Sequence, residues 1–164
     1  AGLVGSEMCI RDRDDIDIVI NTHLHDDHCG NNLLFTKAKF YTHKSEIDFC
    51  NNPHPIDHRY DDYFIEGLEF SLVEDGQEIV PGIVAIHSPG HTMGCLSIQV
   101  ETGTGPAVIT GFCCNRENFP ENGPAVCPGV HLDAIRAWNS IQKVKEMGFT
   151  ILPMHDLELA KIGG

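Results

Sequence analysis

A strand-like segment that runs directly into a cluster of histidines and aspartates constrains this chain more than any other feature. Residues 15–20 read DIDIVI, a β-branched run typical of a buried strand. The next residues read NTHLHDDH, which places four potential metal ligands within six positions: His23, His25, Asp27 and His28. Two histidines at positions i and i+2 of extended backbone point the same way and can share one metal ion, while the aspartate and third histidine are placed to serve a second. A solvated histidine-rich loop is the alternative, but packing does not explain this density of ligands.

Two more histidines lie next to predicted strands further along the chain. His91 belongs to SPGHT, residues 88–92, between two predicted strands, and its neighbour Gly90 allows a tight loop that aims an imidazole inward. His155 belongs to LPMHD, residues 152–156, where the last predicted strand ends. A lone histidine in a loop is more often a surface residue, so each signal is weak by itself. Beside the first cluster, both favour a metal site.

The remaining sequence alternates strand and helix patterns without a repeat or a low-complexity tract. Further predicted strands cover residues 39–42, 68–73, 83–87, 95–100, 107–110 and 151–153, and predicted helices cover 44–50 and 132–147. Residues 51–67 show neither the two-residue alternation of a strand nor the 3.6-residue period of a helix. We interpret them as an irregular loop of the kind that often carries substrate contacts. Mixed strands and helices over this length predict one α/β or α+β domain.

Aromatic and histidine residues outside these motifs are expected in the core or at the surface rather than in the metal site. One face of the long helix is expected to pack against the core: Ala134, Trp138, Ile141 and Val144. Tyr60 and Tyr63 are expected at the surface of the irregular loop, with a cap over the substrate as the alternative. The other histidines are interpreted as surface or hydrogen-bonded polar residues: His43, His54, His58, His87 and His131.

Charge and composition exclude several functional classes. The 164 residues carry a formal net charge of −13, which argues against nucleic acid or an anionic membrane surface as a partner. No apolar run approaches the roughly 20 residues that cross a bilayer. Seven cysteines are an odd number and too few for a disulfide scaffold, so we expect reduced thiols and a cytoplasmic protein.

The first thirteen residues are interpreted as a non-native segment. Residues 3–12, LVGSEMCIRD, look like a translated sequencing adapter, with Arg13 at the junction; a native leader is the alternative. We therefore expect residues 1–13 to add nothing to the core and residues 14–164 to form the domain. On this interpretation the gene is truncated, and its sequence gives no information about a signal peptide.

The three histidine motifs, in this order and at these separations, resemble the metallo-β-lactamase fold. The segments CLSI, GFCCNRENF and HLDAIRAWNSIQKVKEM are most similar to the N-acyl homoserine lactonase-like branch, although hydroxyacylglutathione hydrolases share the metal motifs. The resemblance implies an α/β fold, a four-layer α/β/β/α sandwich with one or two metal ions at the sheet edge, here N-terminally truncated. It implies a first metal held by His23, His25 and His91, and a second held by Asp27, His28 and His155.

The same resemblance implies a metallo-hydrolase that opens a lactone or cleaves a related ester, a quorum-quenching type of activity. Imidazoles with one carboxylate suit Zn²⁺, and Fe or Mn stay open. Zinc with a free coordination position lowers the pKa of its water to about 7, and the resulting hydroxide attacks the carbonyl of an ester, lactone or thioester. Asp27 is the expected catalytic residue, which would orient the nucleophile and pass a proton to the leaving group. A glutathione-type thioesterase is the rival, disfavoured because only Arg59 offers a positive charge in residues 51–67.

The sequence departs from the family pattern in one segment, TGFCCN at residues 110–115. Family members usually carry a metal-bridging Asp where this chain has Phe112, and lactonases of the branch carry a Tyr where it has Asn115. Cys113 or Cys114 could replace the carboxylate as a thiolate ligand, with Cys113 favoured; the alternative is a pair of buried thiols that act as small hydrophobes. Without the bridge we expect a weaker second metal, and a catalytically impaired metal-binding relative is a further hypothesis.

Overall fold

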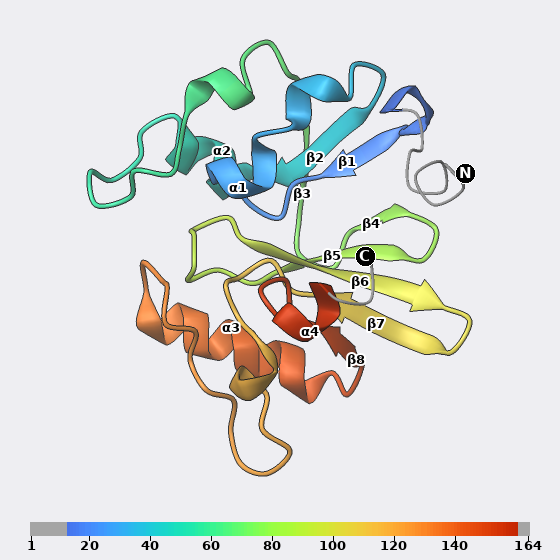
Figure 1. The fold of residues 1–164 in the computed structure, drawn as a ribbon, viewed down its shortest axis with the longest axis vertical. Helices are drawn as coiled ribbons and strands as arrows, with labels where there is room; N and C mark the ends of the chain where they lie inside the picture. Colours follow the sequence, from blue (N-terminus) through green and yellow to red (C-terminus); the bar gives the residue numbers. More distant parts are fainter. Residues whose placement is uncertain (1–12, 161–164) are drawn as a thin grey trace, which may run out of the picture.

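The computed structural model describes residues 13–160, and it arranges them in two β-sheets with helices on both outer faces (Figure 1). Residues 1–12, on which most of the adapter interpretation rests, lie outside the described part. The first sheet has the order β1-β2-β3 and is parallel: β1 Ile18–Ile20, β2 Lys39–His43 and β3 Phe70–Val73. The short helix α1, Asp26–Cys29, and helix α2, Lys44–Cys50, lie on its outer side.

The second sheet has the order β4-β5-β6-β7-β8. Its first four strands are antiparallel and the last pairs in parallel with β7: β4 Glu78–Val80, β5 Ile83–His87, β6 Leu96–Thr102, β7 Gly105–Ile109 and β8 Thr150–Leu152. Helix α3, Ala134–Glu146, and the short α4, Leu157–Ala160, cover its outer face (Figure 1). The fold is the expected four-layer α/β/β/α sandwich, which confirms the fold class. Four 3-10 turns complete the described elements: Arg13–Asp15, Asn32–Leu34, Asp62–Phe64 and Arg116–Asn118.

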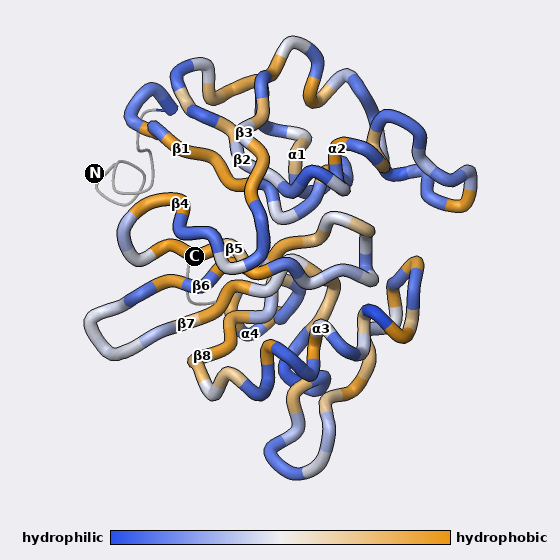
Figure 2. The backbone as a smooth tube through the Cα atoms, turned by 180° about the vertical axis from the view of Figure 1, so that it is seen from behind, coloured by the Kyte–Doolittle hydropathy of each residue, from blue (hydrophilic) through white to orange (hydrophobic). Residues whose placement is uncertain are grey.

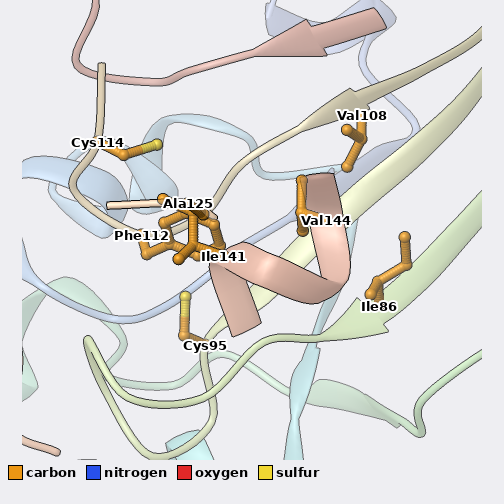
Figure 3. Close-up of a cluster of buried hydrophobic side chains, with 8 residues drawn as sticks. All are labelled: Ile86, Cys95, Val108, Phe112, Cys114, Ala125, Ile141 and Val144. Carbon is orange, nitrogen blue, oxygen red and sulfur yellow. The ribbon is translucent and has the colours of Figure 1, made fainter. Parts of the chain in front are cut away.

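Apolar side chains pack between the layers, and some strands, such as β1 and β8, are coloured as hydrophobic in Figure 2. Between the sheets, Val73, Ala85, Leu96 and Ile98 form one cluster, with Ile20 and Tyr41 packed against it. Between the second sheet and α3, a larger cluster is built around two apolar side chains of that helix (Figure 3): Ile86, Cys95, Val108, Phe112, Cys114, Ala125, Ile141 and Val144. This second cluster fixes the position of the segment that follows β7.

The buried face of α3 differs from the expected one. Ala137, Ser140, Ile141 and Val144 are buried, whereas Ala134 is exposed and Trp138 is 41% exposed, so the predicted place of these two residues in the core is wrong. The indole N–H of Trp138 donates a hydrogen bond to the carbonyl of Ala125 at 3.1 Å, which holds the ring across the helix surface. The loop that carries His91 determines which face of α3 is buried, because the hydroxyl of Ser140 donates a hydrogen bond to the carbonyl of Pro89 in that loop at 2.7 Å.

Two further observations bear on the class of protein. None of the described helices is long and apolar enough to cross a membrane. The six cysteines of the described residues are all free thiols: Cys29, Cys50, Cys95, Cys113, Cys114 and Cys127. Four of them are buried or lie in the apolar clusters, where a thiol packs as a small hydrophobic group.

Candidate metal centre

The first histidine motif leaves the sheet where β1 ends and turns into α1. Asn21 holds this exit: its side-chain amide exchanges two hydrogen bonds with that of Asn32, at 2.9 and 3.2 Å. The carbonyl of Thr22 accepts from the N–H of Leu96 at 2.8 Å, which ties the same stretch to the second sheet. His23 and His25, which lie on this stretch, are both buried.

The rings of three histidines from two distant motifs converge at this point. His91 arrives on the loop between β5 and β6, where Gly90 adopts a φ of 130° and a Cβ would stand 2.1 Å from the backbone nitrogen of Ala137. Only glycine fits so close to α3 in that conformation. The ring centroids of His23, His25 and His91 lie 4.6 to 5.0 Å apart, and one potential ligand atom from each lies within 4.8 Å of the others.

Hydrogen bonds fix which nitrogen of two rings faces the centre. The Nδ1 of His91 donates to the carbonyl of Val130 at 2.9 Å, so a neutral His91 ring presents a bare Nε2. The Nε2 of His25 donates to the carboxylate of Asp57 at 2.9 Å, which leaves Nδ1 free. Asp57 is itself held by two hydrogen bonds from the Arg59 guanidinium, at 3.0 and 3.1 Å. A carboxylate behind a ligating imidazole is the usual arrangement in metal sites.

The geometry of these nitrogens fits a metal ion. The Nε2 atoms of His23 and His91 are 3.3 Å apart. Two nitrogen ligands at about 2.0–2.1 Å from a tetrahedral zinc ion stand about 3.4 Å apart. The separation therefore suits two ligands of one ion, and neutral imidazole nitrogens are donors that zinc accepts.

Burial keeps these imidazoles neutral. It lowers the pKa of His23 well below the usual value, and the neighbouring rings of His28 and His91 lower it further. Burial also lowers the pKa of His91 to about 4, although the hydrogen bond to Val130 opposes the shift. The pKa of His25 is lowered by burial, partly offset by the charge of Asp57. Neutral rings at physiological pH are the form that binds metal.

A second group of potential ligands lies beside the first, with a different membership from the expected one. His23, Asp27 and His28 have ligand atoms within 4.8 Å of one another. The carboxylate of Asp27 is 3.4 Å from the Nε2 of His28, and the Asp27 side chain is 55% exposed. His155 is exposed, and its ring centroid lies 5.7 Å from that of His28, so it stands next to this group but outside the 4.8 Å set.

The segment that follows β7 turns its side chains alternately toward the core and toward the site. Phe112 is 2% exposed and packs beside Ile141 and Ala125 in the core (Figure 3). Cys114 is also buried, with its sulfur 3.2 Å from the hydroxyl of Thr110, and burial raises its pKa to about 12. Cys113 is only partly buried, and both cysteines line a cavity of about 410 Å³ together with His155. Burial and the charge of Asp27 raise the pKa of Cys113, which places this thiol near the second group, and its role as a ligand stays a prediction.

Sequence reasoning missed the polar side chains that support the histidines. Asp57, Arg59 and Tyr60 come from the irregular loop, which is tied to the first motif because the N–H of Asp26 donates to the carbonyl of Arg59 at 2.9 Å. Tyr60 is half-buried rather than at the surface, and its ring centroid lies 4.8 Å from that of His25. The only signal for these residues was the loop's unusual content of histidine, aspartate and tyrosine. Tyr63 is exposed, as expected.

Comparison with known proteins identifies the family. The family model described as the metallo-beta-lactamase superfamily matches residues 8–111. This chain belongs to that superfamily. An N-acyl homoserine lactonase of a Bacillus species is 28% identical over 151 residues, which cover 88% of this chain and 58% of that protein. A probable metallo-hydrolase of Methanocaldococcus jannaschii is 29% identical over 142 residues, which cover 87% of this chain and 58% of that protein.

Solved lactonase structures share the fold. A crystal structure of a B. thuringiensis AiiA mutant with N-decanoyl-L-homoserine bound at the active site has a TM-score of 0.77 and 27% identity. A structure of an N-acyl homoserine lactone hydrolase with the product N-hexanoyl-L-homoserine at its catalytic metal centre gives the same values. Both comparisons cover 96% of this chain and 62% of the other. The chain therefore spans less than two thirds of the length of these relatives.

Proposed function

We propose that this chain is a metal-dependent hydrolase that binds zinc through His23, His25 and His91 and opens a lactone or cleaves a related ester. The observation that carries the proposal is the convergence of three buried imidazoles, two of whose nitrogens are 3.3 Å apart. A carbonyl orients the ring of His91 from behind, a carboxylate orients that of His25, and the Nδ1 of His23 lies 3.2 Å from the Thr22 hydroxyl. Neutral nitrogens held in this way are suited to bind a metal ion.

Each protein group has a separate role in the proposed reaction. A bound zinc ion supplies an acidified water and polarises the carbonyl oxygen of the substrate. Asp27 lies beside His28 at the edge of the site with its carboxylate open to solvent, so it can orient the attacking water and carry a proton to the leaving group. Asp27, His28 and His155 are proposed to hold a second ion, which binds more weakly because residues 110–115 contain no carboxylate.

The proposed substrate class is an N-acyl homoserine lactone or a similar small ester. Support comes from the relatives, whose structures hold N-decanoyl- and N-hexanoyl-L-homoserine. The cavity of about 410 Å³ beside His155 offers room for part of such a molecule next to the metal ligands. The buried free thiols favour a reducing compartment, and we propose that the protein is cytoplasmic.

A metal-binding relative without turnover is the second candidate function. The observation that favours it is the side chain of Phe112, which fills the core and brings no ligand to the site. A lactone assay together with metal analysis separates the two candidates.

The test measures zinc content and hydrolysis of N-hexanoyl homoserine lactone on the same zinc-loaded preparation, with a glutathione thioester as the alternative substrate. We expect about one tightly held zinc per chain and lactone turnover, both lost in His91→Ala. His54→Ala, in an exposed part of the irregular loop, is the matched control and should change neither. Zinc bound without turnover of either substrate would favour the non-catalytic relative, and absence of bound zinc would overturn the proposal.

A further inference from the structure

A buried carboxylate with no cation among its hydrogen-bond partners lies directly behind the histidine cluster. Glu46 sits in the first turn of α2 and is 0% exposed. Its carboxylate accepts four hydrogen bonds: from the N–H of Leu24 at 2.9 Å, the Tyr60 hydroxyl at 2.7 Å, the Thr92 hydroxyl at 2.7 Å and the N–H of Gly94 at 3.1 Å. Burying a charge costs several kcal/mol unless it is well compensated, so such a residue is expected to have a specific role.

The four donors belong to the three segments that build the site. Leu24 stands between His23 and His25, and its N–H binds one carboxylate oxygen. Thr92 follows His91 directly, and its hydroxyl binds the other oxygen. One rigid carboxylate therefore bridges the two loops whose histidines must meet within a few ångströms.

The loop that carries His91 is shaped for this contact. A Cβ on Gly94 would stand 2.1 Å from the backbone nitrogen and 2.5 Å from the Cα of Glu46, so only glycine lets the loop approach this closely. Close approach of the two backbones gives the carboxylate its bond from the Gly94 N–H. The packing and the hydrogen bonds thus fix the position of the His91 loop relative to helix α2.

The charge of Glu46 also acts on the site. Its carboxylate is one of the groups whose charge favours a positive charge at His25. A buried negative charge next to neutral imidazoles stabilises a cation bound among them, because the local environment screens charges less than water does.

We propose that Glu46 is a positioning residue of the metal centre, which holds the two histidine-bearing loops at metal-binding separation and offsets the charge of the bound ion. This inference rests on the proposed metal-dependent function and adds a residue that touches no metal. Tyr60 and Thr92 then orient the carboxylate rather than bind substrate.

The test replaces Glu46 by glutamine and measures zinc affinity by competition with a chelator. Glu46→Gln removes the charge and turns an amide N–H₂ toward one pair of donors, and we expect the Kd for zinc to rise about 10–100-fold. Asp48→Asn is the matched control, since it removes a carboxylate from the exposed side of the same helix, and it should leave the Kd unchanged. The absorption spectrum of the cobalt(II)-substituted protein should shift in Glu46→Gln, because a change in ligand geometry moves the cobalt bands.

The outcomes separate a positioning role from a general structural one. If Glu46→Gln lowers only the melting temperature and leaves zinc affinity and the cobalt spectrum unchanged, the inference is overturned. Thr92→Val serves if Glu46→Gln does not fold: it removes one donor and keeps the charge, and a Kd equal to that of the parent would also overturn the inference. A parent protein that takes up no zinc would overturn the proposed function as well, so the two failures are distinguishable.

Discussion

Replacement of Phe112 by aspartate tests which way the segment after β7 faces. The resemblance to the metallo-β-lactamase family places a metal-bridging carboxylate at this position, whereas the structure buries the Phe112 ring among Cys95, Ala125 and Ile141 (Figure 3). The two arguments predict opposite results for Phe112→Asp. A carboxylate that faced the histidines would strengthen metal binding, and one that entered the core would unfold the domain.

The structure allows the size of the effect to be worked out. Loss of a fully buried phenylalanine side chain costs about 3–5 kcal/mol. An unpaired carboxylate in the same apolar cluster adds several kcal/mol. The sum of about 6 kcal/mol or more approaches the whole stability of an ordinary domain, about 5–15 kcal/mol. At about 2–4 °C per kcal/mol, the melting temperature should fall by roughly 12–24 °C or the variant should not fold.

Thermal denaturation of the metal-free protein, followed by circular dichroism, measures this change. Phe112→Leu is the control, because it keeps the position apolar and should cost about 1 kcal/mol. The reasoning is refuted if Phe112→Asp melts within a few degrees of the parent and binds an additional zinc ion. In that case the side chain at position 112 faces the histidines.

Three other perturbations follow from particular contacts. Gly94→Ala forces a Cβ into the backbone of Glu46 and should lower the stability measured by urea denaturation by about 1–3 kcal/mol; an unchanged midpoint would contradict the close approach. Iodoacetamide should modify the partly buried Cys113 faster than the buried Cys114, as peptide mass mapping can show; equal rates would be evidence against the orientation of this segment. Burial and the ring of His87, stacked at 3.9 Å, lower the pKa of His43 in the folded protein. The neutral His43 ring therefore contributes to stability fully above about pH 6.5, the ordinary pKa of histidine, and this contribution is lost as the pH falls below that value, because the unfolded chain then binds a proton more readily. His43→Phe should flatten the decline in unfolding free energy between about pH 6.5 and 5 in metal-free protein, and an unaltered slope would show that His43 does not cause it.

The histidine cluster could be predicted because its information is local. A short β-branched strand followed by two histidines at i and i+2 fixes the direction of both side chains without knowledge of the rest of the fold. His91 lies 68 positions after His23, and the assignment of both motifs to the same metal ion came from the resemblance to a family. The structure places their nitrogens 3.3 Å apart, while metal binding itself stays a prediction.

The supporting groups could not be predicted, because they act across long stretches of sequence. Glu46 contacts residues 22 positions before it and up to 48 positions after it, and nothing in its own helix marks it as buried. Asp57 likewise binds His25 from a loop without a periodic pattern. A pattern search finds ligands more readily than the residues that orient them.

Periodicity located the helix α3 but assigned part of its buried face wrongly. The expected and observed faces share Ile141 and Val144. They differ because Ala137 and Ser140 are buried in place of Ala134 and Trp138. The 3.6-residue period fits either face, and the two faces differ by a small rotation about the helix axis. Which face is buried therefore depends on the segment that packs against α3. Here the loop around Gly90 leaves room for an alanine and not for an indole.

Anomalous X-ray scattering from crystals of the zinc-loaded protein would show whether His23, His25 and His91 share one metal ion. We expect an anomalous peak about 2.0–2.1 Å from the Nε2 of His23, the Nδ1 of His25 and the Nε2 of His91. A peak bound elsewhere, or no peak in protein that keeps the three rings in place, would contradict this expectation.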